Sequence, residues 1–495
     1  MSLSTRNATL VSCLGLAVVC GLAGQARAAG FALREQSAEG LGDAFAGQTA
    51  KAYNASTVFY NPAGMTNLTG SEVAGTTTWI APESTFKGSN SNVIGGNVAG
   101  RDNVNAIKAA AIGSVFGVWD ASPDWKFGVA VATPFGMRSD YKVNWVGRYQ
   151  ALASDVTDVD FSVVGAYRIN DHLSIGGGPR FDYLKARLSQ AINFNAVGLQ
   201  AAQQYATGAR QAAAAATQLQ AAATQAAAAG QAATAAAYAA QATSYAAQAQ
   251  TLASDAQTTA SWGDGLGKVE GDDYGVGYNL GVLYEFNKNT RVGLDYRSRS
   301  AHTLSGTVNN QTPASLSLAG AATAGLFINQ NATAKITLPD SLNLGFYHDI
   351  NSRWAILSDI QWTHWGLFKQ LNVIGANGQA ISSTNENWQD TWFASLGAHY
   401  KIDSQWMVHG GVAYDLSPIK NDQYRTARIP DSNRYWLSAG ASYVISPATE
   451  LHLGYTHIFA DKANIKETAN SLAGVLNGSY SNSVDIVSSS FVLRF

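Results

Sequence analysis

Apolar and polar residues alternate with a period of two in several stretches of this chain, and no other feature constrains the fold as much. In residues 278–286 the even positions are Tyr, Leu, Val, Tyr and Phe, while Asn279, Gly281 and Glu285 occupy the opposite face. An alternation of this kind is typical of a β-strand with one apolar face. The pattern returns in residues 292–296, 392–400, 408–416 and 451–459.

A transmembrane barrel accounts best for these strands. After residue 28, no apolar run reaches the roughly 18 residues that suggest a membrane-spanning helix. Charged residues make up 13% of the chain, about half the share usual in soluble globular proteins, whereas aromatic residues reach 10%. In a barrel, the apolar strand faces meet lipid and the Trp and Tyr side chains lie at its interfaces. The predicted fold class is therefore all-β.

The connections alternate between short turns and long loops, as in outer-membrane barrels, whose short turns lie on the periplasmic side. Short turns are predicted at residues 121–124, 169–172, 287–290, 349–353, 402–405 and 446–449. Long polar segments lie between them, at residues 81–105, 139–155, 191–272, 306–331 and 461–482. About 14 strands fit between these connections, which places both chain termini on the periplasmic side.

The first residues are predicted to be an export signal. Residues 1–28 contain a short basic start, an apolar run at 10–23 and the cleavage site Ala26-Arg27-Ala28. Both cysteines of the chain, Cys13 and Cys20, lie inside this signal, so no disulfide is expected in the mature protein. A lipoprotein signal ending at Cys20 is an alternative, although Val19 is larger than the residue such signals use.

The last residues resemble the final strand of an outer-membrane barrel. Phe491, Leu493 and Phe495 occur at every second position, and Phe495 ends the sequence. A terminal aromatic strand marks such barrels for assembly. The expected location is therefore the outer membrane of a Gram-negative bacterium, with outer-membrane lipid around the wall.

Two segments do not follow the strand pattern. Residues 29–69 precede the first strand, are rich in small residues and lack alternation, so we expect them to pack as a hatch inside the barrel, residues 70–495. Residues 196–260 are about half alanine, the strongest helix former. This insert in an extracellular loop is predicted to be a helical hairpin that turns near Gly230, with arms of roughly 45 Å. Disorder is the alternative for such a biased composition.

Several motifs resemble the FadL-type outer-membrane transporters of long-chain fatty acids, a family that also includes channels for aromatic hydrocarbons. The resemblance spans nearly the whole chain after residue 28, apart from the Ala-rich insert. It rests on Ala29-Gly30-Phe31, Gly40-Leu41-Gly42-Asp43-Ala44, Asn61-Pro62-Ala63, and residues 165–170, 278–300 and 434–440. It implies a barrel of about 14 antiparallel strands plugged by its hatch, and passive uptake of a hydrophobic small molecule.

The resemblance also implies a kinked third strand whose gap faces the membrane, and Thr133-Pro134-Phe135-Gly136 falls at that place. Pro134 cannot donate a hydrogen bond to a neighbouring strand, and Gly136 tolerates a bulge. Backbone groups left unpaired toward lipid are costly unless something else satisfies them. The hatch residues around Asn61 are the partners we expect. In the alternative interpretation, Pro134 only ends the strand where it enters a loop.

The resemblance further implies that the ligand binds in the lumen and leaves sideways when the hatch shifts. Phe31 and Leu33, near the start of the hatch, are candidate ligand contacts. Family members that bind fatty acids place a basic residue where Gln190 stands here, so Arg187 and Arg297 become the candidates for the carboxylate. Charged residues on a luminal face more often form structural ladders. The missing basic residue leaves neutral or aromatic hydrocarbons as an alternative substrate.

Other functional classes find little support in the sequence. A net charge of −2 gives no basis for binding nucleic acid. No His-Glu-x-x-His or Gly-x-Ser-x-Gly motif occurs and the eight histidines are scattered, so no catalytic residue, metal or cofactor is predicted. An outer-membrane phospholipase would need a Ser/His pair facing lipid, and an adhesion protein would depend on the Ala-rich insert. Both alternatives stay open, and the expected state is a monomer.

Overall fold

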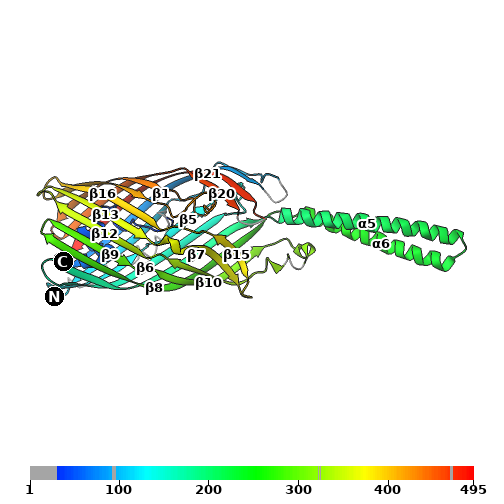
Figure 1. Ribbon diagram of the computed structural model, residues 1–495, viewed down its shortest axis with the longest axis horizontal. Helices are drawn as coiled ribbons and strands as arrows, with labels where there is room; N and C mark the ends of the chain where they lie inside the picture. Colours follow the sequence, from blue (N-terminus) through cyan, green and yellow to red (C-terminus); the bar gives the residue numbers. More distant parts are fainter. Residues whose placement is uncertain (1–29, 92–95, 321–322, 324, 469–471) are drawn as a thin grey trace.

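The computed structural model describes residues 30–91, 96–320, 323, 325–468 and 472–495. The predicted signal peptide, residues 1–28, lies outside the described residues. In the described part, the strands form one antiparallel sheet in which β1 pairs with both β3 and β21, so that the sheet closes into a barrel (Figure 1). The closed barrel has 14 strand positions, which confirms the predicted fold class.

Each position in the wall is one long strand or two shorter strands in line. In chain order these are β1 (Glu72–Ser91), β3 (Ala110–Asp120), β4 (Trp125–Ala132) with β5 (Gly136–Asp140), β6 (Ala153–Arg168), β7 (Leu173–Ile192), β8 (Gly265–Asn287), β9 (Thr290–Arg297) with β10 (Ser300–Gln311), β11 (Gln330–Leu338) with β12 (Ser341–Asp349), β13 (Trp354–Thr363) with β14 (Gln370–Gly375), β15 (Ala380–Asn385) with β16 (Thr391–Lys401), β17 (Trp406–Asp415), β18 (Arg434–Ser446), β19 (Thr449–Ala460) with β20 (Ala463–Thr468), and β21 (Val475–Arg494). The two-residue strand β2 (Val104–Asn105) pairs with β1.

The outer face of the wall is apolar because every second side chain of a strand points outward. On β8, Tyr278 and Leu280 are 47% and 54% exposed, whereas Asn279 between them is buried on the luminal side. Exposed tryptophans flank short turns between strands, namely Trp119, Trp125, Trp354 and Trp406. Such a belt suits the boundary between lipid and water. Among the described helices, none is long and apolar enough to cross a membrane.

The Ala-rich insert forms helices α5 (Phe194–Ala228) and α6 (Ala232–Ala260). They lie side by side and project from the end of the barrel opposite the C-terminus (Figure 1). Gly230 makes the predicted turn with a φ of +74°, a left-handed conformation that favours glycine. At 1.5 Å per residue the two arms are about 52 and 44 Å long. At the base, the apolar side chains of Phe194, Trp262 and Leu316 tie the hairpin to the loop that carries the 3₁₀ helix η2 (Leu316–Ala319).

Residues 30–69, which we call the hatch, lie inside the barrel. They form four short helices, namely α2 (Ala38–Gly42), α3 (Gln48–Lys51), α4 (Thr57–Tyr60) and the 3₁₀ helix η1 (Pro62–Asn67). Luminal glycines of the wall let this chain approach closely. A Cβ atom on Gly281 would lie 2.0 Å from the Asn61 side-chain oxygen, and one on Gly454 would lie 2.2 Å from the Ala38 carbonyl oxygen. The hatch therefore fits only against a wall with glycine at these positions.

The Asn61-Pro62-Ala63 motif fastens the hatch to β8. The Asn61 side-chain amide donates to the carbonyl oxygens of Thr49 (2.7 Å) and Val282 (3.0 Å). Its side-chain oxygen accepts from the Ala63 amide (3.1 Å) and so caps η1. Pro62 is the first residue of this helix, where the absent N–H needs no partner.

Candidate functional site

The third wall strand is interrupted beside the lumen. β4 ends at Ala132 and β5 begins at Gly136. β4 pairs with β3 on one side and β6 on the other, whereas β5 keeps its ladder only with β6. Among the described residues, a single bridge from Ser139 to Ile107 continues the pairing on the other side of β5. The hydrogen bonding of the wall therefore has a gap next to the interruption.

The start of the hatch occupies this interruption. The Leu33 amide donates to the Pro134 carbonyl oxygen (2.7 Å), and the Gly136 amide donates to the Phe31 carbonyl oxygen (2.8 Å). Residues 31–33 thus act as a short antiparallel strand against the kink. They satisfy backbone groups that the proline and the missing β3 contact would leave unpaired.

Gln36, and not Asn61, completes the pairing. The Gln36 side chain donates to the Thr133 carbonyl oxygen (2.8 Å) and accepts from the Thr133 amide (3.3 Å). The expectation that residues around Asn61 satisfy the kink is wrong, because the Asn61 side chain bonds to β8. Later hatch residues, among them Val58 and Met65, pack against β4, but the hydrogen bonds to the kink come from residues 31–36.

A cavity of about 100 Å³ lies between the start of the hatch, the kink and the wall. Leu33, Phe45 and Phe59 line it from the hatch, and Phe135 and Phe393 line it from the wall. An engineered apolar cavity that binds benzene measures roughly 150 Å³. The cavity is therefore smaller than one that holds a single aromatic ring.

Two guanidinium groups reach this apolar cavity. Arg297, at the end of β9, lies 2.8 Å from an Asp160 oxygen, and its guanidinium carbon is 4.4 Å from the centre of the Phe59 ring. Arg34 comes from the hatch, and its guanidinium carbon lies 3.9 Å from the centre of the Phe393 ring. Burial lowers the pKa of Arg34 from its ordinary value, and the carboxylate of Asp415, 4.0 Å away, opposes this shift. The cavity thus joins apolar surface with two guanidinium groups, and the carboxyl groups of Asp295 and Asp359 also line it.

Phe31 holds the start of the hatch in an aromatic cage. Its ring is 3% exposed. Its centre lies 4.8 Å from Trp365, on the 3₁₀ helix η3 (Trp365–Leu367), and 6.0 Å from Trp388. Phe135 of the kink is 5.9 Å away. The same side chain therefore contacts the kink and the loop between β15 and β16.

Glu35 is a buried acid in the same segment. Among the described residues, neither carboxyl oxygen has a hydrogen-bond partner. Burial raises the pKa of Glu35 to about 7, although its own amide and the positive charges of Arg434 and Arg34 lower it. The seated hatch therefore favours the protonated form of this acid.

A second hollow opens at the base of the helical hairpin. It has a volume of about 670 Å³ and is lined by residues of three loops and of the adjoining strand ends, among them Val143, Trp262, Leu266 and Pro313. Arg148 and Asp264 form an ion pair across it, with nitrogen and oxygen 2.7 Å apart. This cleft offers apolar surface at the end of the barrel that carries the long loops.

A family of proteins described as "Outer membrane protein transport protein (OMPP1/FadL/TodX)" matches residues 19–495. The chain belongs to this family. The long-chain fatty acid transport protein of Escherichia coli strain K12 is 27% identical over 476 residues, 93% of this chain and 94% of the relative. Outer membrane protein P1 of Haemophilus influenzae is 26% identical over 463 residues, 90% of this chain and 89% of the relative.

Solved structures of FadL-type proteins have the same fold. A Pseudomonas aeruginosa FadL homologue superposes with a TM-score of 0.75 at 21% identity, covering 94% of this chain and 100% of its own. The Pseudomonas putida toluene transporter TodX gives a TM-score of 0.60 at 16% identity over 94% of this chain and 100% of its own. As a FadL-type protein, the chain is an outer-membrane transporter of hydrophobic molecules in a Gram-negative bacterium, and not an enzyme.

Six of the ten predicted site residues lie at the interruption or its cavity, whereas Asn61, Pro62 and Ala63 lie against β7 and β8 and Arg187 lies apart. Phe31, Leu33, Pro134, Phe135 and Gly136 meet at the interruption, and Arg297 lines the adjoining cavity. Arg187 does not reach it. Its side chain is 56% exposed on the outer face of β7, where it pairs with Glu270 at 3.4 Å. Arg187 belongs to a ladder of charges outside the wall.

Although residue 190 is not basic, a positive charge from another part of the chain lies next to it. Arg428, in the loop between β17 and β18, donates to the Gln190 side-chain oxygen (2.9 Å) and to the Ala153 carbonyl oxygen (3.1 Å). Sequence reasoning missed Arg428 because its distance along the chain from residue 190 hides this contact. It also missed Arg34 and Gln36, although Arg34-Glu35-Gln36 is a polar triplet directly after the apolar start of the hatch.

A serine, a histidine and an aspartate do meet in the wall, but they do not form a lipid-facing catalytic site. His302 Nε2 is 3.0 Å from the Ser300 hydroxyl and 2.7 Å from an Asp182 oxygen. Serine and aspartate thus share one ring nitrogen, whereas a hydrolase triad needs both. The side chains of His302 and Asp182 are fully buried on the luminal side. The contacts serve to pack the wall.

Proposed function

We propose that the chain takes up long-chain fatty acids passively, and that the ligand leaves the lumen sideways through the gap at Pro134, Phe135 and Gly136. This proposal rests on two roles of residues 31–33, at the start of the hatch. Residues 31–33 pair with the kink, and Leu33 also lines the cavity. One displacement of this segment therefore widens the cavity and unpairs the wall. Ligand binding and lateral release become steps of the same motion.

The free energy of burying an acyl chain is large enough to drive that motion. Each methylene removed from water contributes about 0.8 kcal/mol, so a chain of about 15 methylenes gains on the order of 10 kcal/mol. Losing the contacts of a buried Phe such as Phe31 costs about 3–5 kcal/mol. The gain exceeds this cost, and uptake needs no other energy source.

The cleft at the base of the hairpin is the proposed place of first contact. Its apolar lining at Val143, Trp262 and Leu266 suits a hydrophobic chain that arrives from outside. Phe31 and Leu33 are the proposed contacts further inside. The hatch fills the lumen between the outer cleft and these residues, which argues against an open aqueous pore.

The two arginines of the cavity offer partners to an acid that a neutral ligand would not use. Arg297 and Arg34 are positioned to bind a carboxylate, one from the wall and one from the moving segment. Arg34 has only a 4.0 Å contact with Asp415 in the seated hatch, so a ligand carboxylate would compete for it without breaking a close ion pair. A charge-assisted hydrogen bond contributes about 1.5–3 kcal/mol.

Uptake of aromatic hydrocarbons is the second candidate function. The cavity is small and its lining includes the rings of Phe45, Phe59, Phe135 and Phe393. Rings of this kind pack edge to face with an aromatic ligand. The fold similarity to the toluene transporter TodX agrees with this alternative.

Competitive binding to the purified protein tests both candidates. A fluorescent fatty acid is displaced by palmitate or by toluene, in a detergent too short to fill the cavity. We expect Arg297→Met and Arg34→Met to weaken palmitate binding about 10- to 100-fold each, through the lost charge-assisted hydrogen bond. The exposed Arg187→Met is the matched control and should change nothing. Saturable displacement by toluene alone, or equal palmitate affinity in all variants, would overturn the fatty-acid proposal.

A further inference from the structure

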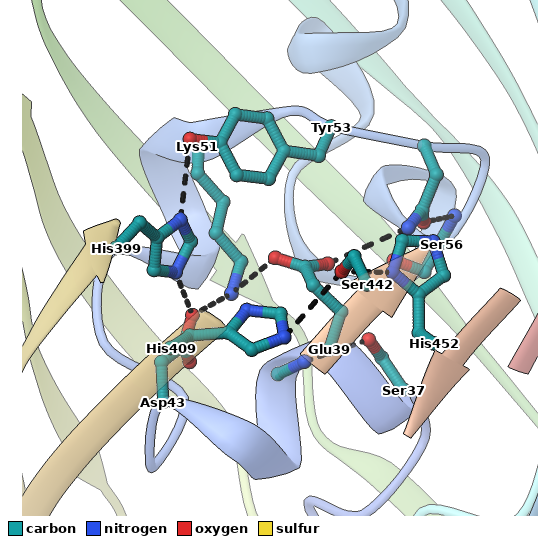
Figure 2. A network of polar contacts seen from close by, with 12 residues as sticks. Ser37, Glu39, Asp43, Lys51, Tyr53, Ser56, His399, His409, Ser442 and His452 are labelled. Atoms are coloured by element: carbon teal, nitrogen blue, oxygen red, sulfur yellow. Dashed lines mark hydrogen bonds and ion pairs between the residues drawn. The ribbon is translucent and has the colours of Figure 1, made fainter. Parts of the chain in front are cut away.

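A cluster of polar side chains joins the hatch to the wall at a place that the substrate pathway does not use (Figure 2). Asp43 follows α2, while His399 lies on β16 and His409 on the neighbouring strand β17. One ligand atom from each lies within 4.8 Å of the other two. The three residues are 0%, 1% and 5% exposed. Oxygen and imidazole donors therefore meet in an enclosed site.

The donor atoms are already oriented. His399 Nε2 lies 2.8 Å from an Asp43 oxygen, and its Nδ1 lies 3.3 Å from the Tyr53 hydroxyl. A hydrogen bond on one ring nitrogen fixes the other toward a metal in many protein sites. Among the described residues, the other Asp43 oxygen and His409 Nδ1 have no hydrogen-bond partner. Buried polar atoms are seldom left in this state, and a bound ion would satisfy such atoms.

Lys51 already places a positive charge at the edge of the cluster. Its ammonium nitrogen lies 2.6 Å from the Asp43 oxygen and 2.9 Å from a Glu39 oxygen (Figure 2). The carboxylates of Asp43 and Glu39 therefore attract a cation to the cluster. Because the lysine stem is flexible, the ammonium can keep Glu39 while it releases Asp43. Lys51 is thus a built-in competitor for any metal ion at Asp43.

We propose that Asp43, His399 and His409 form a binding site for a divalent transition metal ion, with zinc as the best match. Zinc accepts two imidazoles and a carboxylate at about 2.0–2.2 Å, in tetrahedral sites that often keep a water as the fourth ligand. Tetrahedral bonds of this length separate the ligand atoms by roughly 3.3 Å, so small side-chain rotations close the site. The bound ion fastens the hatch to β16 and β17. This inference goes beyond the transport proposal and does not depend on the substrate.

Metal binding is measured on the full-length, tag-free protein, purified in detergent and freed of metal with a chelator. Titration calorimetry with Zn²⁺ gives affinity and stoichiometry, and Co²⁺ in place of zinc reports tetrahedral coordination by its visible absorption. Because the site is buried, each addition is equilibrated until the signal is constant. We expect one ion per chain and a tetrahedral cobalt spectrum. Absence of stoichiometric zinc binding would overturn the proposal.

Three variants locate the ion. His399→Asn and His409→Asn should each lower zinc affinity at least tenfold, while His348→Asn, on β12 and outside the cluster, is the matched control. Lys51→Met removes the competitor and should raise zinc affinity at least tenfold. This opposite sign keeps the test decisive even if a histidine variant fails to fold. Equal affinity in all variants, or no gain with Lys51→Met, would show that zinc does not bind at Asp43.

Zinc should also act on the hatch itself. Saturating zinc is expected to slow hydrogen exchange of residues 38–51 at least tenfold, because a ligand that binds only the seated hatch stabilises that state. Exchange of the hairpin amides in α5 serves as the internal control. An equal effect on both segments would contradict a local fastening by the ion.

Discussion

The aromatic cage around Phe31 sets the free energy that holds the start of the hatch in the gap, and Phe31→Ala measures it. The ring is 3% exposed and packs within 6.0 Å of the centres of Trp365, Trp388 and Phe135. Truncating a buried Phe to Ala costs about 3–5 kcal/mol. The substitution destabilises the seated position of the segment and not the barrel, whose sheet closes without it. Since 1.36 kcal/mol is a factor of ten, the opening constant should rise on the order of 10²- to 10³-fold.

Hydrogen exchange followed by mass spectrometry reads this opening directly. The amides of Leu33 and Gly136 donate across the same contact, one from the hatch and one from β5. Both should therefore exchange faster by the same factor in Phe31→Ala. Local opening, and not global unfolding, controls exchange at such sites.

The control is Phe459→Ala, a lipid-facing side chain that is 53% exposed on β19. It should leave both amides unchanged. A change below about threefold in Phe31→Ala would refute the reasoning, given the loss expected for a buried ring. Acceleration at Leu33 alone, with Gly136 still protected, would show that the kink does not depend on the hatch.

Two further predictions concern pH and the helical hairpin. Burial raises the Glu35 pKa from 4.5 to about 7, so between these values the displaced segment loses a proton that the seated segment keeps. The equilibrium constant for seating should fall by up to about tenfold per pH unit as the pH rises to 7 and stay constant above it. The exchange rate of the Leu33 amide, corrected for the intrinsic pH dependence of amide exchange, should lose this slope in Glu35→Gln. An unchanged slope in Glu35→Gln would contradict the assignment. In the second variant, residues 199–258 are removed and Gly198 is joined to Thr259, since these two residues already lie against each other. Fatty-acid uptake should stay within about twofold, because the apolar base of the hairpin remains. Loss of uptake with a folded barrel would favour a role for the hairpin in transport, and loss of surface attachment would favour adhesion.

The strands of the wall could be predicted because the alternation of apolar and polar residues is a local pattern in the sequence. A strand with one face in lipid must alternate, so residues 278–286 revealed their two faces without any tertiary information. The same parity also decides which way the arginines point. Arg187 has the parity of Phe181, which is 48% exposed, so it lies outside the wall, whereas Arg297 follows Tyr296 and points inward. The parity of these strands could have separated the two arginines before a structure existed.

The interior of the barrel was less predictable because its contacts join distant parts of the chain. The family resemblance, supported by the chemistry of Pro134 and Gly136, places the gap at Pro134. The predicted partner, around Asn61, is wrong, because residues 31–33 and Gln36 make these contacts. No local pattern reports which hatch residue faces the third strand. The cluster of Asp43, His399 and His409 is hidden for the same reason, since more than 350 residues separate Asp43 from the two histidines.

The central claim is that the start of the hatch must leave the third strand for transport to occur. Ala32 and Phe135 face each other across this contact. Directly opposed residues of antiparallel strands have Cα atoms roughly 4.5–5.5 Å apart, a distance that a disulfide spans. The double variant Ala32→Cys with Phe135→Cys therefore permits a reversible lock. The only natural cysteines, Cys13 and Cys20, lie in the predicted signal peptide.

Uptake of labelled palmitate and of labelled toluene is measured in cells that lack their own transporter for these molecules, with each single-cysteine variant as a control. We predict that oxidation stops uptake by the double variant, that a reductant restores it, and that the single variants respond to neither treatment. Uptake by the oxidised double variant at the rate of the reduced protein would contradict the account, because the ligand would then cross the outer membrane without displacement of the hatch from the gap.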